Sequence, residues 1–370
     1  MGSFSLVNER VCATLATQFP QHQLEIIDID KLVKKTHPLN LFWIVCRYGW
    51  DFLSRRRDLW EEIKSREILT RTHYYFQAVR LMIARRLEKK DYLFSFQTQS
   101  LFDASCSGLP HFVYTDHTHL ANLRYPHFDR RKLYPKSWIT REKEIYHNAT
   151  LIFTTSNFVS QSLIEDYGCP PEKVVCVYSG INLDRRFRPS DKQYFAKEIL
   201  FVGKDWLRKG GPDLIEAFLQ VQRMFPDVRL TIVGCRPDVD IPGCEVVGFV
   251  PSEDLWLYYS RASVFCLPSK VEPSAAVLAE AAAHALAVVS TNVGGTPDRV
   301  IHGESGYLIT AGRVDELASA LIDLLGDREK CERFGKKGYE LTCERFSWER
   351  VGEKMKESIE TAINAHSQDP

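Results

Sequence analysis

The sequence of 370 residues has no apolar run long enough to cross a bilayer, since the best candidate, Leu39–Cys46, is short and ends at Arg47. It also shows no signal peptide. Its ten cysteines form no C-x-x-C pair and no Cys/His cluster with zinc-finger spacing, which disfavours a disulfide framework and a structural zinc site. These absences predict a cytoplasmic protein with reduced thiols.

Net charge is absent as well, because 48 Lys and Arg side chains balance 48 Asp and Glu side chains. Residues 1–190 carry seven more basic than acidic side chains, and residues 191–370 carry seven fewer. So small a basic excess does not indicate a nucleic-acid partner, and it favours an anionic acceptor or membrane surface only weakly. The composition, 44% hydrophobic and 26% charged, is typical of a globular chain with two domains.

Short apolar, β-branched runs alternate with longer helical stretches along the chain. The runs are Leu24–Ile29, Tyr92–Phe96, His111–Tyr114, Leu151–Thr155, Val174–Val177, Ile199–Val202, Val228–Val233, Cys244–Val247, Val264–Leu267, Ala287–Ser290 and Gly306–Ile309. This alternation predicts an α/β fold of two Rossmann-like, doubly wound parallel-sheet domains that face each other across a cleft.

The predicted domain boundaries follow a change in composition. Residues 185–197 are polar without apolar periodicity and are predicted to form a linker. They separate an acceptor-side domain, residues 1–184, from a donor-binding domain, residues 198–347. The segment 348–370 is predicted to be a C-terminal helix that crosses back to the first domain.

A basic loop follows the strand predicted over Ile199–Val202. It contains Lys204, Arg208 and Lys209, and leads through glycines into a helix predicted over Asp213–Met224. Cations beside a helix N-terminus suit a phosphate group. These residues alone leave open the alternative that the three charges are simply solvated.

Two acids eight residues apart, Glu272 and Glu280, follow the strand Val264–Leu267. If Pro273 starts a helix, Glu272 lies at its N-terminus and Glu280 about two turns later. The amides of Ala275–Val277 would then add donors for an anion. The helix is apolar on all sides and therefore predicted to be buried, where a carboxylate needs a partner. A ligand-binding role is favoured over a surface role for both acids.

These segments resemble motifs of the retaining GT-B glycosyltransferases of family GT4, whose E-x7-E signature matches Glu272–Glu280. Further matching segments are Val202-Gly203, Lys209-Gly210, Ile232–Gly234, Val247–Pro251, Tyr258–Val264, Pro268-Ser269, Ala287–Pro297, Ile301–Ile309, Glu344–Trp348, Thr115–His117, Thr155–Val159, Tyr167–Val174 and Ser179–Asn182. The sequence departs from the family at Lys204, which replaces an arginine, and at Ala275 and Ala285, which replace glycines.

The resemblance implies transfer of a sugar, with retention, from a UDP-, GDP- or ADP-sugar to an unidentified acceptor, whether a glycan, a lipid-linked molecule or a small molecule. It implies no cofactor and no metal. Glu272 would bind hydroxyls of the transferred sugar, Glu280 the ribose, and Lys209 the diphosphate. The remaining residues implied on the donor side are Lys204 for the diphosphate, Ala275, Ala276 and Val277 at the helix start, and Gly248, Phe249 and Val250 around the base.

On the acceptor side, His117 matches the family histidine placed near the anomeric carbon, ahead of its neighbours His111, His119 and His127. Asp116 is either an alternative base or a group that orients His117. Gly2 lies in a segment resembling the glycine loop after a first strand. No strand precedes it, so either the native start lies upstream, which we expect, or the first sheet lacks its central strand.

Two features imitate other functions. Asp238-Val-Asp240 imitates a D-x-D metal motif, but lies in a loop between prolines, so no metal is assigned to it. Residues Tyr74–Lys90 form a basic amphipathic stretch, for which a core-packed helix is favoured over docking at the inner face of a membrane. The rival functions are a nucleotide-sugar epimerase or a phosphorylase on the same fold, and a catalytically inactive sugar-nucleotide-binding subunit.

Overall fold

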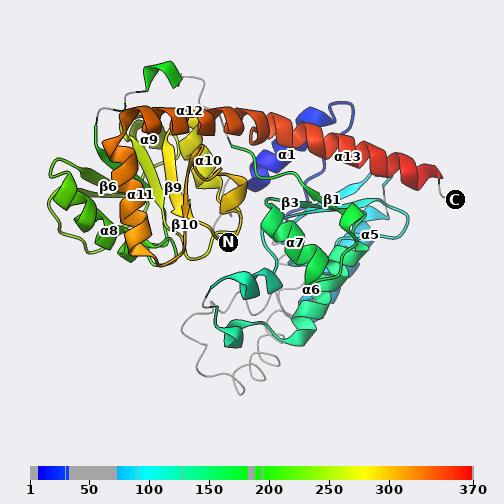
Figure 1. Ribbon diagram of the computed structural model, residues 1–370. Helices are drawn as coiled ribbons and strands as arrows, with labels where there is room; N and C mark the ends of the chain where they lie inside the picture. The colour runs from blue at the N-terminus through cyan, green and yellow to red at the C-terminus, as the bar shows by residue number, and fades with distance from the viewer. Residues whose placement is uncertain are drawn as a thin grey trace.

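The computed structural model describes residues 7–29, 31–32, 73–88, 90–126, 128–181, 187, 189–192, 194 and 196–368. Within these ranges the chain forms two parallel sheets, each flanked by helices, which lie side by side (Figure 1). The predicted fold class of two parallel-sheet α/β domains is therefore confirmed, although among the described residues only the second sheet shows the reversal in strand order of a doubly wound sheet. None of the helices described is both long enough and apolar enough to cross a bilayer.

The first sheet has the strand order β1-β2-β3-β4, with every neighbouring pair parallel. Its strands are β1 (Ser95–Thr98), β2 (His111–Thr115), β3 (Leu151–Thr154) and β4 (Val174–Cys176). The helices of this half are α1 (Val7–Gln18), α5 (His73–Leu87), α6 (Lys136–Asn148) and α7 (Asn157–Glu165), with 3-10 turns η2 (Leu120–Arg124), η3 (Arg130–Lys132) and η4 (Pro171–Lys173).

The strand predicted over Leu24–Ile29 is wrong, because this segment pairs with no strand of the first sheet. Two of its apolar side chains face solvent, Leu24 at 43% exposed and Ile26 at 67% exposed, whereas Ile29 packs against the cluster formed by α5. Glu25 instead holds the segment to the end of α5, where Arg86 and Lys90 donate to its carboxylate at 2.6 Å. The run has the composition of a strand, but it has no neighbouring strand to pair with.

The basic stretch at residues 74–90 forms α5. This helix packs into the core, which is the role that the sequence favoured over docking at a membrane. Phe76, Val79 and Ile83 are buried, while the side chains of Arg85 and Arg86 are exposed. The amphipathic pattern is thus explained by packing within the domain.

The second sheet has the order β10-β9-β8-β5-β6-β7, again entirely parallel. Its strands are β5 (Glu198–Val202), β6 (Arg229–Val233), β7 (Cys244–Gly248), β8 (Val264–Leu267), β9 (Ala287–Thr291) and β10 (Gly306–Ile309). The helices are α8 (Gly211–Met224), α9 (Leu255–Arg261), α10 (Ala276–Ala283), α11 (Val314–Gly326) and α12 (Arg328–Arg345), with 3-10 turns η5 (Pro189–Asp191) and η6 (Thr296–Asp298).

The order of the second sheet reverses between β5 and β8. The chain runs outward from β5 through β6 to β7, then returns to the other side of β5 and runs outward again. In open α/β sheets, ligands bind outside the carboxyl ends of the strands at such a switch point. The loops 203–210 and 268–275, which follow β5 and β8, are therefore brought together at the place where a ligand is expected.

The last helix, α13 (Trp348–Gln368), leaves the second half and packs against α1 of the first half (Figure 1). Its buried residues Val351, Met355 and Ile359 join one apolar cluster with residues of α1, β2 and β3. The predicted crossing helix is thus confirmed, and it contributes part of the core beneath the first sheet.

His111 makes stability depend on pH. Its ring is 1% exposed in β2, and burial lowers its pKa to about 4. The unfolded chain, with a pKa near 6.5, therefore takes up a proton before the folded one does as the pH falls. We expect the unfolding free energy to drop on the order of 3 kcal/mol between pH 6.5 and pH 4 from this residue. Urea unfolding of wild type and His111→Asn across this range should show a flatter pH dependence in the variant; equal slopes would contradict the assignment.

Candidate active site

The loops after β5 and β8 are joined by direct contacts. Arg208 donates from Nη1 to the carbonyl oxygen of Val271 at 2.8 Å, and its own carbonyl accepts from the amide of Lys270 at 2.8 Å. Gly210 has a positive φ of 78°, and a Cβ there would lie 1.9 Å from the carbonyl oxygen of Pro268. The Lys209-Gly210 segment thus needs glycine because the two backbones approach so closely.

Lys209 and Glu272 form a buried ion pair at this junction. The two residues are 9% and 6% exposed, and the ammonium group of Lys209 donates to Oε2 of Glu272. The same carboxylate accepts from the amide of Ala275 at 3.2 Å and from the hydroxyl of Ser269 at 3.4 Å. The structure therefore brings together two side chains predicted for the sugar and the diphosphate. It also shows that the Ala275 amide, expected to be free, already has an acceptor.

The helix after Glu272 begins at Ala276, three residues later than the predicted start at Pro273. Ala275 is its N-cap and has left-handed backbone angles, φ 53° and ψ 33°. The intervening residues instead form a turn that folds the Glu272 carboxylate back onto the helix start. Ala276 and Val277 still occupy the first turn, so the predicted helix N-terminus remains beside Glu272.

Ala275 and Ala285 are left-handed, with φ of 53° and 52°, and these are two positions where the related family has glycine. A Cβ disfavours this region. We therefore expect Ala285→Gly to stabilise the protein by about 0.5–1 kcal/mol, the relief of strain less the greater entropy lost by glycine. Ala283→Gly, which changes a residue within α10, should instead cost about 1 kcal/mol. Thermal unfolding of both variants tests this difference in sign.

Glu280 lies on α10 and accepts a hydrogen bond from the hydroxyl of Tyr259 at 3.2 Å. Burial raises the pKa of Glu280, while this hydrogen bond and the charges of Arg299 and Lys209 lower it. Lys209 thus acts electrostatically on Glu280 as well as pairing with Glu272.

The edge predicted to hold the base is open. β7 ends at Gly248, whose carbonyl accepts from the amide of Gly234 at 2.7 Å, and the next side chain, Phe249, is 71% exposed. Val250 packs against the core of the second sheet.

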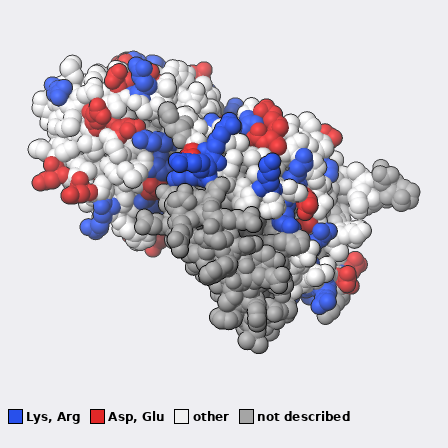
Figure 2. Space-filling model, turned by 90° about the horizontal axis from the view of Figure 1, so that it is seen from below, with Lys and Arg blue, Asp and Glu red and all other residues white. Residues whose placement is uncertain are grey.

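Lys204 is exposed at the start of the β5 loop. Figure 2 shows Lys and Arg side chains gathered near the middle of the face seen from below.

From the first sheet, the loop after β2 carries His117. Thr115 donates to the His117 carbonyl at 2.7 Å, and the His117 ring stacks on Tyr125 with centroids 6.4 Å apart. Burial lowers the pKa of His117, against the raising effects of Asn122 and of the adjacent, partly buried Asp116. Its Nδ1 is buried and meets no partner among the described residues. The imidazole is thus neutral and keeps one nitrogen unused.

Two competing histidines have other contacts. His119 stacks on Tyr134 at 4.0 Å and accepts from the Tyr134 amide at 2.7 Å, while His111 pairs with Ser95 inside the core. Gly2 and His127 lie outside the described residues. His111 and His117 each have one buried ring nitrogen without a partner among the described residues, and of these two it is His117 that lies in the loop after β2.

Glu142 of α6 anchors the same loop, and sequence patterns did not indicate it. Its buried carboxylate accepts from the hydroxyls of Tyr167, Ser100 and Tyr146 and from the amide of His119. Burial raises its pKa and these donors oppose the rise. Only an alignment or the fold itself could reveal this role, because the donors are up to 42 residues away in sequence.

Arg299 is a second residue that the sequence did not indicate. It is 2% exposed, lies 4.0 Å from the Phe346 ring centroid, and donates to the hydroxyl of Ser179 at 2.8 Å and to the carbonyl of Ser274 at 3.3 Å. Ser179 follows the first sheet, and Ser274 belongs to the loop of Glu272. Arg299 thus ties that loop to the junction of the two halves.

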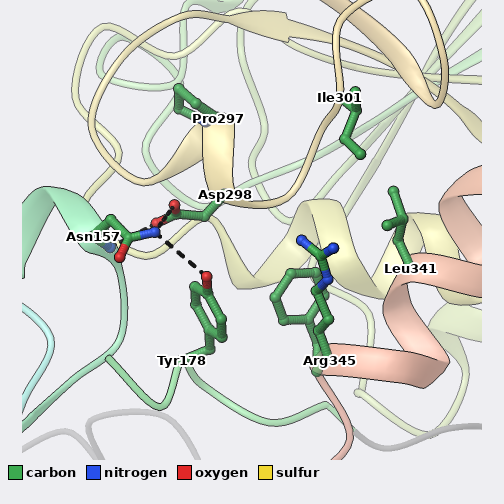
Figure 3. Close-up of a pocket in the computed structure, with 8 residues that line it drawn as sticks. Asn157, Tyr178, Pro297, Asp298, Ile301, Leu341 and Arg345 are labelled. Carbon is green, nitrogen blue, oxygen red and sulfur yellow. Dashed lines mark hydrogen bonds between the residues drawn. The ribbon is translucent and has the colours of Figure 1, made fainter. Parts of the chain in front are cut away.

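The two halves also meet directly behind the loops. Ser156 donates to the Pro273 carbonyl at 2.7 Å, and Asn157 donates to Asp298 through its amide at 2.8 Å and its side chain at 2.7 Å. A cavity of about 240 Å³ borders these contacts (Figure 3). It is lined by Asn157, Tyr178, Pro297, Asp298, Ile301, Leu341, Arg345 and Phe346. None of the residues predicted to bind the donor lines it.

Comparison with known proteins agrees with this arrangement. Residues 184–341 match the family model of glycosyl transferases group 1, and residues 12–185 match that of glycosyltransferase family 4. A solved sucrose-phosphate synthase from Thermosynechococcus elongatus superposes with a TM-score of 0.62 at 21% identity, covering 84% of this chain and 80% of that one. The chain has the GT-B fold.

Other GT-B glycosyltransferases resemble it over shorter stretches. Anabaena HepE, solved in complex with UDP-glucose, has a TM-score of 0.56 at 18% identity and covers 68% of this chain and 72% of that one. The glycogen synthase of Mycobacterium tuberculosis is 27% identical over 228 residues, which are 58% of this chain and 54% of that protein. The chain thus spans about half the length of this relative.

Proposed function

We propose that the protein transfers a sugar, with retention of anomeric configuration, from a nucleoside-diphosphate sugar bound at the switch point between β5 and β8. The observation that carries this proposal is the buried Lys209–Glu272 pair beside the N-terminus of α10. A carboxylate and a cation held together away from water can bind a sugar diol and a diphosphate side by side. The similarity of both halves to glycosyltransferase families supports it.

In the proposed complex, Lys209 moves part of its hydrogen bonding from Glu272 to the diphosphate, which Lys204 also approaches. This frees Glu272 to accept from hydroxyls of the transferred sugar. Glu280 binds the ribose, and main-chain groups of Gly248, Phe249 and Val250 contact the base. The positive end of α10, at Ala275–Val277, adds to the field that stabilises the leaving diphosphate.

In the proposed reaction, the acceptor hydroxyl attacks the anomeric carbon on the face from which the diphosphate departs. The bond between that carbon and the diphosphate oxygen breaks, and the departing diphosphate takes the acceptor proton. His117 contributes as a neutral hydrogen-bonding group near the anomeric carbon, consistent with its lowered pKa. We propose that no metal is required, because the two lysines and the helix terminus already supply positive charge.

The donor nucleotide is proposed to be a UDP-, GDP- or ADP-sugar, with UDP-glucose tested first because HepE was solved with it. The test is the thermal stability of the purified protein with each nucleotide and its sugar, with and without Mg²⁺. A ligand at 100 times its Kd should add about 2.7 kcal/mol to the unfolding free energy. A shift with one base, independent of Mg²⁺, supports the proposal. No shift with any base contradicts it, and binding without turnover by any acceptor favours an inactive subunit.

A further inference from the structure

Tyr125 carries a hydroxyl group that its surroundings leave unused. The residue is 4% exposed at the end of η2, and its hydroxyl makes no hydrogen bond of normal geometry within the described parts of the chain, its nearest polar group there being the backbone of Glu272. Its ring is well packed, stacked on His117 and tilted against Phe158 with centroids 5.0 Å apart. Phenylalanine would pack equally well, and without a well-formed hydrogen bond the buried hydroxyl is not fully compensated for its desolvation in the free protein.

The hydroxyl points from the first half of the molecule toward the loop of the second half that contains Glu272. A Cβ built at Gly294 would lie 2.9 Å from the Tyr125 oxygen and 2.0 Å from the carbonyl oxygen of Glu272. Burial raises the pKa of Tyr125 and the charge of Glu272 raises it further, while the charge of Arg208 and a contact with the Glu272 backbone lower it. The phenol therefore lies close to the loop that holds the Lys209–Glu272 pair.

The position of Tyr125 limits what its hydroxyl can meet when the site is filled. On one side is His117, whose Nδ1 is also buried and unused, and on the other is the loop of Glu272. A group that enters between them must offer hydrogen-bonding atoms to a phenol, an imidazole and a carboxylate at once. The several hydroxyl groups of a hexose can form hydrogen bonds with the phenol, the imidazole and the carboxylate together. A base or a diphosphate would not use all three of these groups.

We propose that the Tyr125 hydroxyl binds a hydroxyl group of the transferred sugar and so distinguishes the sugar nucleotide from the free nucleotide. This inference rests on the proposed sugar-transfer function. It gives the first sheet a part in recognising the donor, beyond its role on the acceptor side. In the filled site the phenol gains the partner it lacks in the free protein.

The test is Tyr125→Phe, which removes only the hydroxyl and keeps the stacked ring. Isothermal titration calorimetry would give Kd values for UDP and UDP-glucose, GDP and GDP-mannose, and ADP and ADP-glucose. For the pair that wild type binds, we expect affinity for the sugar nucleotide to fall about tenfold while affinity for the free nucleotide stays unchanged. The melting temperature of the free variant should equal or exceed that of wild type.

The matched control is Tyr307→Phe, which removes a hydroxyl that donates to Asp323 at 2.6 Å, and should leave both affinities unchanged. An unchanged ratio of the two Kd values in Tyr125→Phe, with normal binding by wild type, overturns the role of Tyr125 alone. A parallel loss of nucleotide and sugar-nucleotide affinity also overturns it, because the effect would then be structural. If wild type binds none of the six ligands, the proposed function fails and this inference fails with it.

Discussion

Replacing Glu272 by glutamine is expected to lower sugar transfer about 10²–10³-fold, the usual cost of losing one charge placed to act in the transition state. Glutamine keeps the length and shape of the side chain but carries no charge. It therefore binds the hydroxyls of the sugar and the ammonium group of Lys209 more weakly. The measurement is the turnover rate with a saturating donor, once thermal shifts have identified it. Glu304→Gln, an exposed position in the loop before β10, serves as the control and should retain full activity.

The same substitution should also destabilise the protein, because it leaves the buried Lys209 charge without its counter-ion. Breaking a buried pair from one side costs about 3–5 kcal/mol. Lys209→Met should cost a similar amount by stranding Glu272. The double variant removes both charges and should recover most of the stability while transfer remains lost. Urea unfolding of the four proteins measures this coupling, and strictly additive losses would show that the two side chains do not depend on each other.

Gly294→Ala is expected to destabilise the fold and to displace the loop that contains Glu272. Gly294 has a φ of 57°, and a Cβ there would lie 2.0 Å from the Glu272 carbonyl oxygen, a backbone atom that cannot turn away. We expect a loss of about 2–5 kcal/mol, combining about 1–2 for the left-handed conformation and about 1–3 for overpacking. Because the displaced backbone is that of Glu272, nucleotide-sugar binding should weaken as well.

Gly312→Ala provides the matched control for this prediction. Gly312 has a similar left-handed φ of 79°, but a Cβ there would meet nothing within 4 Å. It should cost only about 1–2 kcal/mol and leave binding intact. Thermal unfolding and nucleotide binding of the two variants separate the conformational effect from the steric one. Equal effects on both measurements would mean that the close approach at Gly294 has no consequence.

The sequence predicted the second sheet well, because strands such as Val264–Leu267 are continuous apolar runs buried on both faces. It failed at Leu24–Ile29, where the same local pattern lacks a neighbouring strand. Local pattern also misplaced the start of α10: Pro273 suits a first helical turn, but the Glu272 side chain takes the amide of Ala275 and delays the helix.

Short, ordered motifs predicted Lys209 and Glu272 to belong to one site, and the structure places these two side chains in contact. Their roles in donor binding stay a prediction. The residues missed, Tyr125, Glu142 and Arg299, act through partners far away in the chain. No periodicity records such contacts. Their importance depends on burial and on which hydrogen bonds are made or left unmade, which are properties of the folded molecule.

The path of α13 has a consequence for biosynthesis. Val351, Met355 and Ile359 fill the core beneath the first sheet, alongside Val11 and Leu15 of α1. A ribosome delivers the first sheet long before it delivers these three side chains. The core of the N-terminal half therefore lacks three of its side chains until α13 has been made, whereas the core of the second sheet lies within residues 194–334. We expect the N-terminal half, although it is synthesised first, to complete its core last.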